Sequence, residues 1–152
     1  MSDVTCRRAR RDDVAAIVAL LADDHLGAER EVVSDPPAPA YLDAFDAIDG
    51  HPNVLLAVAE IADEVVGCLQ IDYLPGLSRR GAWRGQIEAV SVARTRRGAG
   101  IGTAMIRWAV ARCRARGCAL VQLTSHKSRG DAHRFYTRLG FEASHEGMKL
   151  TL

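Results

Sequence analysis

The sequence predicts a single α/β domain with a mixed sheet. Segments whose apolar residues recur every three or four positions, as on one face of a helix, alternate with short apolar runs typical of strands. Two of the short runs are separated by a tight turn near Ala62-Asp63, and two more at the C-terminal end indicate a second hairpin. A chain of 152 residues can build one core that buries about two-thirds of its unfolded surface. We therefore expect residues 1–152 to form one domain.

A helix is the clearest element in the first half of the chain. Asp12 and Asp13 suit a helix N-terminus, and apolar side chains follow at helical spacing from Val14 to Leu21. The prolines between residues 27 and 40 indicate a mobile connection. The other elements expected here are strands over residues 4–8, 54–60 and 65–73, and a short helix over residues 40–48.

In the second half, a strand, a glycine-rich loop and a long helix follow one another. A polar loop of residues 75–84 precedes an apolar strand over residues 86–93, which leads into the glycines. The next helix is expected over residues 101–116, with Gly117 as its C-terminal stop. The remaining elements are a buried strand over residues 119–124, a short helix over residues 131–139, and a closing hairpin of residues 141–144 and 148–152.

The composition argues against several classes of protein. The 20 basic and 19 acidic side chains nearly balance, which disfavours a general binder of nucleic acids or of membrane surfaces. The four cysteines show no CxxC pairing and no histidine at zinc-ligand spacing, so we expect free thiols and no metal site. No signal peptide and no bilayer-spanning apolar run is visible, which predicts a cytoplasmic protein. The excess of arginine over lysine indicates a GC-rich bacterial genome.

The segment from Arg97 to Gly102 carries the strongest functional signal. Its three glycines lie between an expected strand and an expected helix, where they let the backbone approach a ligand closely. The first amides of the helix have no intrahelical partner and lie at the positive end of the helix dipole, and Arg97 adds a charged donor. We therefore expect a phosphate group of a cofactor to bind here. The alternative is a glycine-rich turn without a ligand.

Two widespread phosphate-binding motifs do not fit this segment. A Walker loop ends in Gly-Lys-Ser/Thr, whereas this chain has Gly102-Thr103 without a lysine. A dinucleotide fingerprint counted from Gly98 would need a third glycine where Thr103 stands, and too little sequence follows for the rest of such a domain.

Two longer motifs resemble the GNAT superfamily of N-acetyltransferases. Residues 92–102, Val-Ala-Arg-Thr-Arg-Arg-Gly-Ala-Gly-Ile-Gly, are similar to the family's acetyl-CoA signature, with Arg94 in place of the usual proline. Residues 132–141, Ala-His-Arg-Phe-Tyr-Thr-Arg-Leu-Gly-Phe, resemble its second signature, Ala-x-x-Phe-Tyr-x-x-x-Gly-Phe. The resemblance extends over residues 4–152 and is weakest over residues 25–51. It implies a GNAT-like mixed, mostly antiparallel central sheet flanked by helices.

The resemblance also implies that acetyl-CoA serves as co-substrate and donates its acetyl group to an amine. Residues 97–103 would hold the pyrophosphate. The pantetheine arm would pair like an extra strand with the end of the strand over residues 86–93, in a slot that a strand bulge could open. A strand amide near Val90 or Val92 would polarise the thioester carbonyl. The cofactor-binding residues assigned on this basis are Val90, Ser91, Val92, Arg97, Gly98, Ala99, Gly100, Ile101, Gly102, Thr103, Ala132 and Phe135.

Glu88 is our candidate for the general base. An alkyl amine has a pKa of about 10, so it arrives protonated and must lose a proton before it attacks. Glu88 lies four residues before Val92, so strict alternation predicts that both side chains share one face of the strand. Residues 87–90 also resemble members that use a strand glutamate as base. Alternatively, Glu88 is solvated or pairs with Arg84, and the rival bases are His25, His51, Glu60 and Asp72.

Tyr136 is our candidate for the general acid. It matches the family tyrosine whose hydroxyl protonates or orients the departing thiolate; the alternative is an ordinary core residue. Many members carry an asparagine a few residues before Ala132, and this chain does not. Ser125, Ser128 or Arg129 is expected to replace it, and Lys127 and Arg129 are candidates for the 3′-phosphate of CoA.

The sequence says less about the acceptor of the acetyl group than about the cofactor. We expect a primary amine of a small molecule, attacking directly in a ternary complex. The alternatives are a protein lysine or N-terminal acetyltransferase and a non-catalytic acetyl-CoA-binding sensor. Arg79, Arg80 and Arg84 make the loop of residues 75–84 basic, which suits an anionic acceptor unless these arginines are merely solvated. Residues 123–141 faintly resemble aminoalkylphosphonate-type members. We expect no nucleic-acid or membrane partner, and a homodimer could use an edge strand near residues 148–152.

Overall fold

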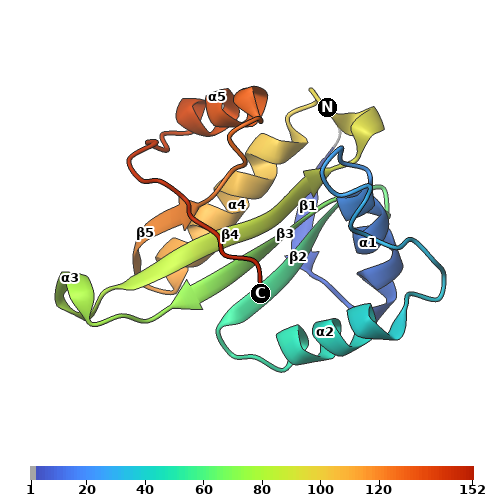
Figure 1. The fold of residues 1–152 in the computed structure, drawn as a ribbon, viewed down its shortest axis with the longest axis horizontal. Helices are drawn as coiled ribbons and strands as arrows, with labels where there is room; N and C mark the ends of the chain where they lie inside the picture. Colours follow the sequence, from blue (N-terminus) through green and yellow to red (C-terminus); the bar gives the residue numbers. More distant parts are fainter. Residues whose placement is uncertain (1–2) are drawn as a thin grey trace.

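The computed structural model describes residues 3–152 and shows one mixed sheet in this part of the chain (Figure 1). Its strands lie side by side in chain order: β1 (Thr5–Arg8), β2 (Val54–Ile61), β3 (Glu64–Leu74), β4 (Trp83–Val92) and β5 (Cys118–Leu123). Neighbouring strands from β1 to β4 are antiparallel, and β4 and β5 are parallel. The predicted mixed, mostly antiparallel sheet is confirmed.

Helices cover both faces of the sheet (Figure 1). One face carries α1 (Val14–Ala22), entered through the short turn η1 (Arg11–Asp13), and α2 (Pro39–Asp49). The other face carries α4 (Ile101–Ala115). The remaining helical segments are α3 (Ser78–Gly81), η2 (Arg94–Arg96) and α5 (Gly130–Arg138). None of the helices within residues 3–152 is long and apolar enough to cross a membrane.

Two hydrophobic clusters hold these layers together, one on each face of the sheet. Met105 and Ala109 of α4 pack with Ile71 and Ile87 of the sheet in the first cluster. The second cluster joins the apolar side chains of α1 to Phe45 and to the other face of the strands. The apolar face predicted for α1 is therefore confirmed, since Val14, Ile17 and Val18 are all buried.

Local turn chemistry agrees with the sequence at two positions. Ala62 and Asp63 have φ of 49° and 65°, the left-handed backbone that a two-residue hairpin between β2 and β3 requires. Gly117, with φ of 79°, ends α4 as predicted.

A glycine near the start of β4 lets the long helix approach the sheet. A Cβ atom added at Gly85 would lie 2.2 Å from the Sγ atom of Cys113, which faces it from α4. Real atoms do not approach so closely, so a larger residue here would push α4 away from the sheet.

Three predictions about the second half are wrong. Arg84 lies within β4 instead of in the preceding loop, because pairing with β3 begins already at Leu74. None of the residues of β5 is fully buried, since β5 is the last strand of the sheet. Residues 141–152 form no strand, so the predicted closing hairpin is absent. Alternating apolar residues favour a strand but do not specify its partner.

Candidate active site

A bulge interrupts β4 at Ala89. Glu88 lies opposite Gln70 of β3, whereas Ser91 lies opposite Cys68, so two residues of β4 face Leu69 alone. Ala89 has a φ of 53°, unusual for a residue with a side chain. Such a bulge bends its strand and increases the local twist.

The last two strands of the sheet, β4 and β5, separate at this bulge. Pairing between β4 and β5 ends at Ile87 and Leu123, although β4 continues to Val92. Over residues 88–92 the edge of β4 is therefore not paired with β5, and apart from the carbonyls of Ala89 and Val92, which accept from Cys68 and Arg97, an extended ligand could pair with it as an added strand. The opening expected between these strands is present, and a bulge lies where it begins.

The bulge also overturns the prediction that Glu88 and Val92 share a face. Residues directly opposite each other in a sheet point to the same side. Glu88 therefore points to the side of Gln70, toward the face that carries α1 and α2, and Val92, opposite Gly67, packs in the cluster under α4. One extra residue in the strand reverses the alternation. Ser91 instead shares the face of Glu88, and its hydroxyl donates to the Leu20 carbonyl of α1 at 2.9 Å.

The glycine-rich loop ends at the N-terminus of α4. Gly98 and Gly100 both have a φ of 81°, and a Cβ atom at either would meet nothing within 4 Å, so open space surrounds the loop. The Ala104 amide donates to the Gly100 carbonyl at 3.1 Å, which begins the helical ladder and leaves the amides of residues 101–103 without intrahelical acceptors. The Ile101 side chain is only 2% exposed, so this residue can offer a ligand its backbone alone.

Arg97 lies at the edge of the loop, between β4 and α1. Its Nε donates to the Val92 carbonyl at 3.2 Å, and its Nη2 donates to the Asp23 carbonyl at 3.2 Å. Arg94 also binds Asp23, through an Nε–Oδ1 contact of 3.4 Å. The end of α1 is thus bound to the segment that precedes the glycines.

The two sequence motifs meet in space. A Cβ atom at Gly102 would lie 3.3 Å from Cζ of Phe135, so α5 packs directly on the first turn of α4. Phe135 in turn packs edge-on against Tyr136, with ring centroids 5.0 Å apart. Burial raises the pKa of the Tyr136 phenol, and the charge of Arg129 opposes this shift. The phenol therefore stays protonated at neutral pH.

Arg129 is engaged with the end of α1. Its Nη1 donates to Asp24 Oδ1 at 3.0 Å, and a second contact joins the same two side chains. The hydrogen bonds from Arg129 lower the pKa of the Asp24 carboxyl despite its partial burial. This ion pair joins the end of α1 to the loop before α5.

Glu88 belongs to a polar row that crosses three strands. Gln86 Nε2 donates to Glu88 Oε1 at 2.6 Å, and Gln122 Nε2 of β5 donates to Gln86 Oε1 at 2.9 Å. On β3, Gln70 Nε2 donates to Asp72 Oδ1 at 3.0 Å, and these two residues lie opposite Glu88 and Gln86. We call Gln70, Asp72, Gln86, Glu88 and Gln122 the polar row. Sequence reasoning missed its glutamines, although their period-two spacing on β3 and β4 was a visible signal.

Arg84 lies on the same face of β4 as the polar row. It is two residues before Gln86, and its cross-strand neighbours are Leu74 and Leu120. Its Nε atom is buried and has no hydrogen-bond partner within residues 3–152. The pairing with Glu88 that the sequence left open is not seen there.

Three of the four rival bases are placed less favourably than Glu88. Glu60 is bound to Arg7, with Oε1 at 3.0 Å from Nε. His51 accepts from the Asn53 amide at 3.0 Å, near Tyr73 at the other end of β3. His25 follows α1, with 3.5 Å between its Nδ1 and Asp24 Oδ1. Asp72 is the rival within the polar row itself, and the described residues contain no cluster of side chains that could hold a metal ion.

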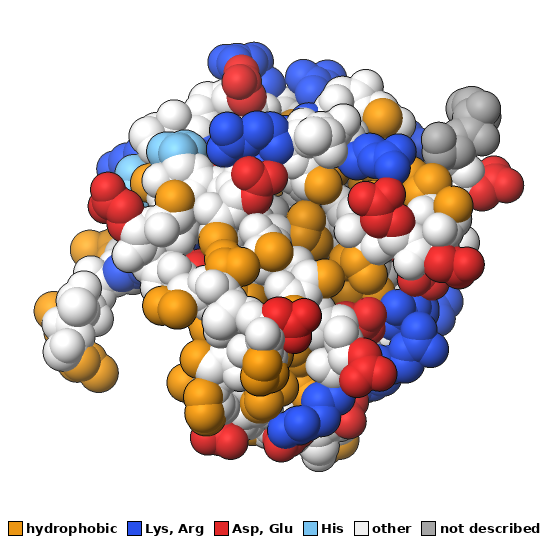
Figure 2. All heavy atoms as spheres, turned by 90° about the vertical axis from the view of Figure 1, so that its right-hand side faces the viewer, with side chains coloured by type: hydrophobic (Ala, Val, Ile, Leu, Met, Phe, Trp, Pro, Cys, Tyr) orange, Lys and Arg blue, Asp and Glu red, His pale blue; other side chains and the backbone are white. Residues whose placement is uncertain are grey.

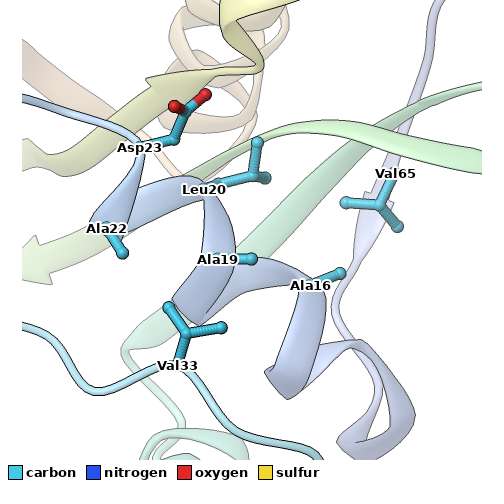
Figure 3. Close-up of a pocket in the computed structure, with 7 residues that line it drawn as sticks. All are labelled: Ala16, Ala19, Leu20, Ala22, Asp23, Val33 and Val65. Carbon is cyan, nitrogen blue, oxygen red and sulfur yellow. The ribbon is translucent and has the colours of Figure 1, made fainter. Parts of the chain in front are cut away.

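A separate surface hollow lies over α1 (Figure 3). It has a volume of about 570 Å³ and is lined by Ala16, Ala19, Leu20, Ala22, Asp23, Val33 and Val65. Figure 2 shows this side of the molecule, where apolar side chains gather between acidic and basic ones. Its one ionisable group, Asp23, is bound to Arg94. The hollow therefore offers no free base, and the polar row remains the better candidate for acceptor chemistry.

Comparison with known proteins agrees with this arrangement. The family model described as acetyltransferase (GNAT) family matches residues 15–141. The aminoalkylphosphonate N-acetyltransferase of Salmonella typhimurium, a curated relative, is 30% identical over 139 residues, which cover 91% of this chain and 85% of that protein.

Solved structures show the same fold. A transcriptional regulator from Bacillus halodurans is 45% identical, with a TM-score of 0.96 over 99% of this chain and 100% of that one. An acetyltransferase fold from Clostridium acetobutylicum, determined with acetyl-CoA, has a TM-score of 0.75 at 19% identity, over 98% and 96% of the two chains.

Proposed function

Because this chain belongs to the acetyltransferase (GNAT) family, we propose that it acetylates the primary amine of a small molecule by direct attack in a ternary complex with acetyl-CoA. The observation that carries this proposal is the position of Glu88. It is an exposed carboxylate immediately before the bulge, where β4 and β5 separate. A base at that point lies beside the slot in which the reacting thioester would lie.

The residues present fit acetyl-CoA. The free edge of β4 over residues 88–92 offers backbone groups to the pantetheine amides, and the open glycine loop offers amides to the pyrophosphate. Residues 97–103 and the end of β4 are therefore the proposed cofactor contacts, together with Ala132 and Phe135 of α5, of which Phe135 packs on Gly102. Acetyl-CoA supplies an activated acetyl group as a thioester.

Glu88 is proposed to take the proton from the acceptor's ammonium group, directly or through a water molecule. The amide of Gln86 holds one of its carboxylate oxygens and leaves the other for the acceptor. A backbone amide near Val90 or Val92 is proposed to stabilise charge on the thioester oxygen. Tyr136 is proposed to donate its hydroxyl proton to the departing sulfur, and burial, which raises the pKa of this phenol, keeps that proton in place until then.

We further propose that the acceptor carries an anionic group. Arg84 and Glu88 share a face of β4, and four residues of strand separate their Cα atoms by about 13 Å. An amine at Glu88 could then place an anion toward Arg84, whose buried Nε has no partner within residues 3–152. The name of the Salmonella relative, an aminoalkylphosphonate N-acetyltransferase, supports this class of acceptor.

The test is acetyl-CoA turnover, followed as thiol release, against a panel of amines. The panel would contain aminoalkylphosphonates, amino acids, polyamines, aminoglycosides and lysine peptides, with cofactor binding measured separately by calorimetry. Turnover confined to small amines with an anionic group is the expected result. Preference for peptides would favour a protein acetyltransferase. Cofactor binding without turnover would favour a sensor, a role compatible with the description of the Bacillus halodurans relative as a transcriptional regulator.

A further inference from the structure

Two glutamine side chains connect Glu88 to the neighbouring strand. Gln86 Nε2 donates to Glu88 Oε1 at 2.6 Å, and Gln122 Nε2 donates to Gln86 Oε1 at 2.9 Å. Gln86 and Gln122 lie opposite each other on β4 and β5, one position before the pairing of these strands ends. The hydrogen bonds therefore reach Glu88 from the last part of β5 that is still paired with β4.

The carboxylate of Glu88 sets the direction of both amides. An ionised carboxylate only accepts hydrogen bonds, so Gln86 must turn its NH2 group toward Glu88. The side-chain oxygen of Gln86 then faces β5, where the NH2 group of Gln122 donates to it at 2.9 Å. Both ends of the Gln86 amide are thus bound, one to the carboxylate and one to the next strand.

Without Gln122, the Gln86 side chain would not stay in one place. A glutamine has several rotatable torsions, and fixing them costs conformational entropy. Glu88 is exposed, and Gln86 is the one side chain that donates to its carboxylate within residues 3–152. Gln122 is half-buried and holds the far end of the Gln86 amide, which keeps the donor beside Glu88 Oε1.

The glutamine directly across from Glu88 has a different partner. Gln70 lies opposite Glu88 on β3, but its Nε2 donates to Asp72 Oδ1 at 3.0 Å. The side chains that bind Glu88 therefore come from its own strand and, through Gln86, from β5. Gln122 is the better candidate for holding Glu88 in position, although it lies farther away.

We propose that Gln122 is a positioning residue for the reaction and acts on Glu88 through the Gln86 amide. This role rests on the proposed function, in which Glu88 is the general base. With Oε1 held by Gln86, Oε2 is the oxygen that faces the acceptor. The proton passes from the acceptor's nitrogen to Oε2, and the nitrogen keeps the electron pair with which it attacks the thioester. Gln122 contacts neither reacting group; it fixes the direction of Oε2.

The test compares two substitutions that nearly keep the size of Gln122, with kcat measured at saturating acceptor and acetyl-CoA. Gln122→Met cannot donate, so kcat should fall by about threefold to tenfold, the contribution of one neutral hydrogen bond. Gln122→Glu only accepts, so the Gln86 oxygen must face one of two carboxylates, and kcat should fall by about tenfold to a hundredfold. The KM for acetyl-CoA should stay unchanged in both variants.

The order of the two losses separates positioning from packing. Glutamate resembles glutamine in shape more closely than methionine does, so a merely structural role predicts that Q122E is the milder change. Circular dichroism melts would check that both variants are folded. If Q122E does not fold, Q122M carries the comparison, and a Q122M rate equal to the wild type would overturn the role of Gln122.

The same substitutions in the E88Q background show whether Gln122 acts through Glu88. There each should change the residual rate by no more than about twofold, because the amide that E88Q introduces can donate as well as accept. An equal fold-loss with and without E88Q would overturn the role of Gln122 and leave Glu88 as the base. An unchanged rate in E88Q alone would instead overturn Glu88 as the base, and with it the premise of this role.

Discussion

Replacing Glu88 with glutamine tests the proposed base with a minimal change in shape. The glutamine keeps an oxygen where Glu88 Oε1 accepts from Gln86 at 2.6 Å, but its amide cannot take up a proton at neutral pH. Glu88 is exposed, so the free energy of unfolding should change by about 0.5 kcal/mol or less. A loss of activity would then report on proton transfer and not on folding.

The expected loss of turnover in E88Q follows from the pKa of the acceptor amine. With a pKa of about 10, only about one amine in a thousand is unprotonated at pH 7. Without a base, the E88Q enzyme depends on that fraction, so turnover should fall by about 10² to 10⁴, or roughly 3–5 kcal/mol of activation free energy. The residual rate should rise about tenfold per pH unit up to the pKa of the acceptor, as the free amine becomes available.

The assay is thiol release at saturating acetyl-CoA, with Asp72→Asn as the matched control. Asp72 is the other carboxylate of the polar row, and it is already bound to Gln70 at 3.0 Å. We expect a much smaller loss for D72N and an unchanged pH dependence. An E88Q rate within about threefold of the wild type would refute the role of Glu88 as base, and a large loss in D72N would make Asp72 the base.

Three further substitutions separate the other roles. Tyr136→Phe should lower turnover by about tenfold to a thousandfold with little change in acetyl-CoA affinity by calorimetry, because only the proton donor is removed; unchanged turnover would remove Tyr136 from the mechanism. Arg84→Ala should lower kcat/KM for an anionic acceptor by about tenfold to a hundredfold and leave an uncharged amine unaffected, since a charge-assisted contact contributes about 1.5–3 kcal/mol; an equal loss for both would contradict anion recognition. Gly85→Ala should destabilise the fold by about 1–3 kcal/mol in urea, because its Cβ atom would lie 2.2 Å from Cys113 Sγ. The double variant with Cys113→Ala should recover part of that loss, and additivity would argue against this contact.

Most of the fold follows from local patterns in the sequence. The helical spacing of α1, the hairpin turn at Ala62-Asp63 and the stop at Gly117 each depend on residues close in the chain, and each was predicted. The two signatures were also enough to indicate that the glycine loop and α5 belong to one site. In the structure, the contact of Gly102 with Phe135 joins them.

The features that the sequence did not predict depend on pairing between segments that lie far apart in the chain. Residues 148–152 have the alternation of a strand, but alternation does not say which strand they would pair with, and they form no strand in the structure. The extent of β4 is a similar case. Arg84 lies in a polar stretch that resembles a loop, yet pairing with Leu74 and Leu120 makes it part of the sheet. Arg84, which the sequence placed in a basic loop, is therefore a candidate binding residue on the sheet.

The bulge at Ala89 explains why Glu88 is a candidate base although Glu88 and Val92 do not share a face of the strand. In a regular strand, Glu88 and Val92 would share a face, and the carboxylate would lie on the same side as the side chain that packs under α4. Because of the extra residue in the bulge, corresponding side chains before and after it point to opposite faces of the sheet. Before the bulge, Glu88 points to the open polar face; after it, Val90 and Val92 pack into the core. Because pairing with β5 also ends there, the carboxylate and the unpaired backbone edge lie at the same irregularity, so the proposed base and the proposed cofactor slot are neighbours on one strand.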